Sequence, residues 1–130
     1  MKRVIRGVTV LGVMLGVPFA VAEEGHRHDM APPAQAGTQT VTGEVVDLAC
    51  YLGHGAQGAE HRDCAQKCIS SGLPVGIKSG DTIYLAVGGE HGTANATLAP
   101  LAGKQVTAEG AVSERDGVHL IAIKKVTAQS

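Results

Sequence analysis

The C-terminal part of the chain holds the feature that most restricts its fold, two long β-strand patterns joined by a tight turn. The segments QVTAEGAVS and VHLIAIKKVTA flank residues 114–117, which end in the Asp-Gly dipeptide typical of hairpin turns. The second pattern spans residues 118–126 and is apolar on both faces over residues 120–123. Such a strand suits the interior of a barrel or sandwich better than an exposed sheet edge.

Three further strand patterns precede this pair. Residues 40–52 are rich in strand-forming valine, and their alternation predicts that Cys50 lies on the same face as the core residues. Residues 75–78 and 82–87 indicate a second hairpin, and residues 96–102 indicate one short helical turn interrupted by a proline. The pattern predicts a mainly β fold, a small five-stranded and partly open barrel of the OB (oligonucleotide/oligosaccharide-binding) type.

A helix is predicted at residues 59–71, between the first two strand patterns, and it carries two of the three cysteines. At about 100° per residue, His61, Cys64 and Cys68 share the helix face that leans toward the core. Gly72, followed by leucine and proline, is typical of a residue that ends a helix in the left-handed conformation. The sequence therefore predicts two thiols and one imidazole on one helix face, with the thiol of Cys50 close by at the end of the first strand.

Both ends of the domain can be placed from composition. Residues 1–22 have a basic start, an apolar stretch and a final Ala-Val-Ala, which is the order of a signal peptide. We expect cleavage after Ala22 rather than an uncleaved anchor, and therefore a periplasmic or secreted protein with no membrane segment in the mature form. Residues 23–39 predict a flexible linker whose histidines are solvated rather than metal-bound, and residues 40–128 form the folded domain.

Charge and aromatic content limit the partners of the mature chain. Loss of residues 1–22 removes three of the 11 basic residues and none of the 12 acidic ones, so eight remain against 12 and the net charge is −4. The only aromatic residues then left are Tyr51 and Tyr84. An acidic chain without a stacking platform is not expected to bind nucleic acid. Its small aliphatic core would gain from a covalent or metal staple.

Three segments carry a resemblance to a known kind of protein. GEVVDLACYL, HRDCAQKCISSGLPVGI and LAPLAGKQVTAEGAV together resemble a group of small exported bacterial proteins, largely uncharacterised, that have an OB-like domain and three cysteines. The resemblance covers residues 40–127. It implies the fold and the export, and it assigns no activity.

Three interpretations of the cysteines remain open at this point. In the first, Cys50, Cys64 and Cys68 bind one soft or borderline metal ion, Cu(I) or Zn(II), with His61 as the preferred fourth ligand. In the second, Cys50 is bridged to Cys64 or Cys68 in a structural disulfide, since two cysteines four apart in an unbroken helix are poorly placed to bridge each other. In the third, the thiols serve disulfide redox chemistry or copper handover, with another exported protein as the partner.

Catalytic motifs are not found. The sequence has no G-x-S-x-G elbow for a hydrolase and no C-x-x-C-H for covalent haem attachment. We therefore predict no catalytic residues and favour a binding protein over an enzyme. The loop histidines His54 and His91 are expected at the surface, and the Asn95 glycosylation pattern is attributed to chance.

Overall fold

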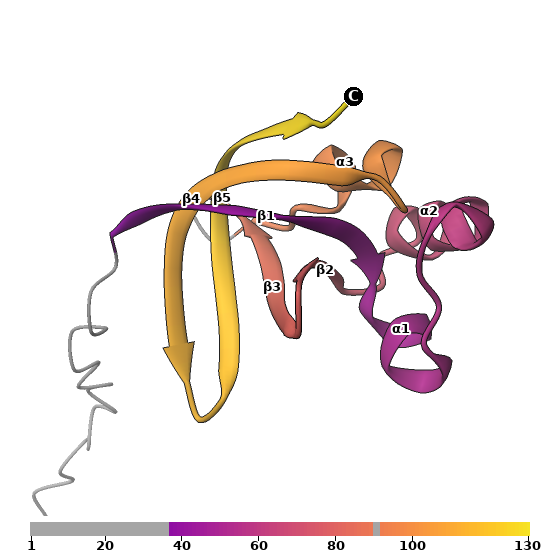
Figure 1. The fold of residues 1–130 in the computed structure, drawn as a ribbon, viewed down its shortest axis with the longest axis horizontal. Helices are drawn as coiled ribbons and strands as arrows, with labels where there is room; N and C mark the ends of the chain where they lie inside the picture. The colour runs from indigo at the N-terminus through magenta and orange to yellow at the C-terminus, as the bar shows by residue number, and fades with distance from the viewer. Residues whose placement is uncertain (1–36, 90–91) are drawn as a thin grey trace, which may run out of the picture.

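Five strands close into a barrel in the computed structural model, which describes residues 37–89 and 92–130 (Figure 1). The predicted signal peptide, most of the predicted linker and His91 lie outside the described residues. The elements are β1 (Thr38–Asp47), α1 (Leu48–His54), η1 (Ala59–His61), α2 (Arg62–Ser70), β2 (Val75–Ser79), β3 (Thr82–Gly88), α3 (Asn95–Leu98), η3 (Ala99–Leu101), β4 (Gln105–Arg115) and β5 (Val118–Ala128).

The strand order around the barrel is β1-β2-β3-β5-β4. β1 pairs antiparallel with β2 through its last residues and with β4 through the rest, so that Glu44 has Lys78 and Gln105 as partners on its two sides. β3 and β5 pair in parallel and complete the ring, and β4 and β5 form the long hairpin seen in Figure 1. The predicted mainly β, OB-like five-stranded barrel is confirmed, and its ring of strands is closed where a partly open one was expected.

Two glycines allow strands to approach closely where the barrel curves. A Cβ atom added at Gly43 would lie 2.3 Å from the carbonyl oxygen of Lys78, and one added at Gly110 would lie 2.2 Å from that of Ala122. Gly110 also follows the register shift between β4 and β5. A side chain at either position would push the backbones apart, because such contacts are far inside van der Waals distance.

The barrel is filled by aliphatic side chains, as the composition predicted. The most deeply buried large residues of this core come from the strands, from α2 and from α3: Val45, Ile69, Val75, Ile77, Leu98, Val106 and Ile121. Asp47 is the one charged residue that is buried among the described residues, with 1% of its surface exposed.

The predicted strand over residues 40–52 is wrong in its second half. β1 ends at Asp47, whose carboxylate caps α1 by accepting hydrogen bonds from the backbone N–H groups of Ala49 (3.2 Å) and Cys50 (3.1 Å). The cap outweighs the alternation of apolar residues, since it satisfies N–H groups that a helix start otherwise leaves without a partner. Cys50 therefore lies on a helix, and Leu52, expected in the core, is 73% exposed.

The remaining predicted elements differ from the structure by small amounts. The predicted helix at residues 59–71 is present as η1 followed by α2, and the hairpin of β2 and β3 is confirmed. The turn between β4 and β5 is only Asp116 and Gly117, both with positive φ, because Glu114 and Arg115 still belong to β4. No helix within the described part of the chain is long and apolar enough to cross a membrane.

Candidate metal centre

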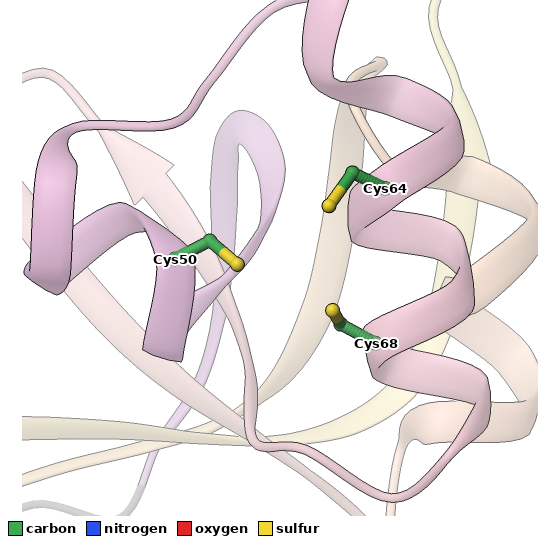
Figure 2. Close-up of side chains that lie close together, drawn as sticks. All are labelled: Cys50, Cys64 and Cys68. Carbon is green, nitrogen blue, oxygen red and sulfur yellow. The ribbon is translucent and has the colours of Figure 1, made fainter.

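The three cysteines lie on two helices inserted between β1 and β2. α1 provides Cys50, and α2, which follows after a short connection, provides Cys64 and Cys68. Both helices lie beside the end of β1 in Figure 1. Figure 2 shows the three side chains pointing toward the space between α1 and α2.

The sulfur atoms of Cys50, Cys64 and Cys68 all lie within 4.8 Å of one another. All three are free thiols. Cys50 and Cys68 are half-buried and Cys64 is exposed, so the cluster is open to solvent on the Cys64 side. The structure thus brings together the three cysteines that the sequence analysis selected, although Cys50 reaches the cluster from a helix instead of from a strand end.

α1 is held in place at its first turn. Besides the Asp47 cap, the backbone N–H of Leu48 donates to the carbonyl of Pro74 at 2.9 Å. The Leu48 side chain is buried against Gly76, where an added Cβ would lie only 2.6 Å from a Leu48 methyl carbon. These contacts fix the start of the helix, and Cys50 follows within its first turn.

α2 is anchored through its last turn. Ile69 is fully buried in the barrel core, next to Cys68 in the sequence. Leu73 N–H donates to the carbonyl of Cys68 and Gly72 N–H to that of Ile69, with φ of +102° at Gly72, which is the Schellman geometry predicted for the helix end. The Asn95 side-chain amide donates to the carbonyls of Ile69 (2.7 Å) and Leu73 (2.8 Å).

The surroundings favour the protonated form of two of the thiols, those of Cys50 and Cys68. A hydrogen bond with the Asp47 carboxylate, together with partial burial, raises the pKa of Cys50 to about 12. Burial also raises the pKa of the Cys68 thiol, against the opposing effect of a hydrogen bond with Cys50. A positive ion in the cluster would reverse this preference, because it stabilises thiolates that the buried carboxylate otherwise destabilises.

Two histidines are close in sequence to the cysteines of the cluster. His61, the predicted fourth ligand, is half-buried at the end of η1, and the group of mutually close ligand atoms comprises the cysteines alone. His54 is exposed at the last position of α1, and its ring centroid lies 6.4 Å from that of His61. The role of His61 as a fourth ligand stays a prediction.

α1, and with it the contact between Asp47 and Cys50, was not predicted from the sequence. The signal was present: Asp47 is a favoured N-cap residue, Gly55 suits a left-handed helix end, and the intervening residues include good helix formers. Gly55 has φ of +73° and ends the helix as that pattern predicts.

Two surface hollows of about 570 and 430 Å³ border α2. Polar side chains line much of both, including Gln66 and Ser70, and none of the three cysteines lines either one. The thiols are therefore placed against each other, in a space suited to an ion, and not along the wall of either hollow.

Comparison with protein-family models, with curated protein sequences and with solved structures returns no match. The resemblance to small exported three-cysteine proteins thus remains a prediction.

Proposed function

We propose that this chain binds one Cu(I) or Zn(II) ion through the thiolates of Cys50, Cys64 and Cys68. The observation that carries the proposal is the convergence of all three sulfurs within 4.8 Å. Around one ion with metal–sulfur bonds of about 2.3 Å, three sulfurs lie roughly 3.8–4.0 Å apart. Closing the cluster on an ion therefore takes sulfur movements of about 1 Å or less, which side-chain rotations can supply.

The two ions make different demands on the site. Cu(I) is well served by three soft thiolates, whereas a structural Zn(II) site is almost always four-coordinate. His61 is the proposed fourth ligand for Zn(II), since it directly precedes α2 and is three residues before Cys64. An ion would enter or leave the cluster past Cys64, the exposed cysteine of the three.

Asp47 would support the metal site through its contacts with Cys50. Its carboxylate is buried and holds the backbone N–H of Cys50, which fixes the start of the helix that bears this ligand. Such supporting groups orient ligands and affect metal affinity. The carboxylate adds a further negative charge to the thiolates and thereby favours the bound cation over the empty, deprotonated cluster.

A second candidate function is disulfide chemistry, favoured by the contact between the Cys50 and Cys68 thiols. A bridge between them would join α1 to α2 and leave Cys64 as a free, exposed thiol. It would use two of the three convergent sulfurs, while a metal ion uses all of them. For this reason the metal site is preferred and the bridge, structural or redox-active, is the alternative.

The cellular setting belongs to the same proposal. The signal-peptide pattern of residues 1–22 supports a periplasmic or secreted protein, with another exported protein as the donor or acceptor of the ion. The acidic mature chain does not favour nucleic acid as a partner.

Anaerobic titration of the reduced protein with Cu(I) and with Zn(II), followed by native mass spectrometry, tests the proposal. We expect one ion per chain, and we expect Cys50→Ser, Cys64→Ser and Cys68→Ser each to abolish stoichiometric binding. His61→Gln should weaken Zn(II) more than Cu(I), and His119→Gln, on β5, is its matched control.

Two results would decide against the metal site. Unchanged binding by Cys50→Ser would assign the ion to two cysteines or to the histidines before the domain. Intact mass before and after thiol alkylation addresses the alternative: protein isolated from its native compartment with one disulfide involving Cys50, and no metal binding after reduction, would establish the bridge.

A further inference from the structure

α1 ends in a histidine and another histidine directly precedes α2, each three or four residues from a cysteine of the cluster. His54 follows Cys50 by four residues, and His61 precedes Cys64 by three. Residues four apart in a helix lie on the same face, so His54 and Cys50 share a face of α1. The face of α1 that presents its thiol to α2 therefore also presents an imidazole, and His61 lies in the turn that leads into α2.

The two imidazole rings also lie near each other. Their ring centroids lie 6.4 Å apart, with the ring planes inclined by 59°. Two imidazoles bound to one tetrahedral ion at metal–nitrogen distances of about 2.0–2.1 Å have centroids roughly 5.2–5.4 Å apart. The observed separation exceeds this by about 1 Å, a distance that side-chain rotations can close.

We propose that His54, the last residue of α1, and His61, the residue before α2, form a second metal site. It would take a borderline ion, Zn(II) or copper, through one nitrogen of each ring, with water completing the shell. His54 is exposed and His61 half-buried, so solvent reaches the pair. Two neutral ligands bind such ions more weakly than three thiolates, so the site fits transient occupation next to the cysteine cluster.

The test should remove the thiols, because His61 is also the proposed fourth ligand of the cysteine site. In the full chain carrying Cys50→Ser, Cys64→Ser and Cys68→Ser, histidine side-chain NMR signals are followed during titration with Zn(II) alone. We expect the signals of His54 and His61 to shift together with one dissociation constant. The signals of His119 and of the histidines before the domain are resolved separately and serve as internal controls.

A single substitution then tests whether the two rings act as a pair. His54→Gln should weaken the response of the His61 signal to Zn(II) by about tenfold or more. If the triple variant does not fold, the same titration is made on wild-type protein loaded anaerobically with one equivalent of Cu(I), and the same paired response is expected.

Two outcomes would overturn the second site. Absence of any shift of both signals at millimolar Zn(II) would mean that the rings only stack, and an undiminished His61 response in His54→Gln would mean that they bind independently. Neither outcome bears on the three-thiolate proposal, since the triple variant lacks that site and Cu(I) stoichiometry measures it separately.

Discussion

Removal of the Asn95 side-chain amide should destabilise the protein through the end of α2. The amide donates two short hydrogen bonds, to the carbonyls of Ile69 (2.7 Å) and Leu73 (2.8 Å). At about 0.5–1.5 kcal/mol net for each bond, Asn95→Ala should lower the free energy of unfolding by about 1–3 kcal/mol. Asn95→Asp should cost at least as much, because a carboxylate cannot donate and faces two carbonyl oxygens at a helix C-terminus.

Urea unfolding of the reduced, metal-free protein, followed by circular dichroism, measures this difference. The midpoint should fall while the slope with denaturant stays constant, since neither change alters the surface exposed on unfolding. Thr97→Ala is the matched control, because Thr97 is exposed on the same short helix, α3. An Asn95→Ala protein as stable as the control, or an Asn95→Asp protein more stable than Asn95→Ala, would refute the reasoning.

Three further predictions concern the barrel, the thiols and α1. Gly110→Ala should destabilise by about 1–3 kcal/mol in urea unfolding, since its Cβ would lie 2.2 Å from a carbonyl oxygen, and Gly37→Ala, which meets nothing, should have little effect. The raised pKa of Cys50 means that the folded, metal-free state holds this proton more tightly than the unfolded state. Its stabilising effect should therefore be complete below pH 9.0 and be lost as pH rises toward about 12, and a Cys50→Ser protein with the same pH profile would contradict this. Binding of Zn(II) or Cu(I) should slow amide hydrogen exchange in α1 (Leu48–His54), and unchanged exchange in the loaded protein would contradict a ligand on this helix.

The barrel could be predicted from the sequence because its strands obey local rules. The apolar run in β5, the Asp-Gly turn before it and the hairpin of β2 and β3 are each visible within about ten residues of chain. The register shift at Gly110 and the close approach of β1 to β2 at Gly43 could not be predicted, because each depends on a strand that is distant in the sequence.

The sequence predicts which cysteines form the cluster, but it predicts their positions only in part. Cys64 and Cys68 share a face of α2 as helical spacing requires, whereas Cys50 was assigned to a strand because Val46, Leu48 and Cys50 alternate. Alternation over a few residues does not separate a strand from the first turn of a helix, and here the carboxylate of Asp47 decides. The contact between His54 and His61 depends on how two helices pack, which no local pattern specifies.

The barrel closes without any contribution from the cysteines. None of the cysteines belongs to the buried core, and the strands that enclose that core form a complete ring without them. A seven-residue helix such as α1 is marginal by itself, so its position depends on the Asp47 cap and on the burial of Leu48. In a zinc finger, loss of the ion unfolds the chain, because the ion replaces a core. Under the proposed function, an ion between α1 and α2 would leave past exposed Cys64 while the barrel stays folded, and the barrel would not depend on the ion.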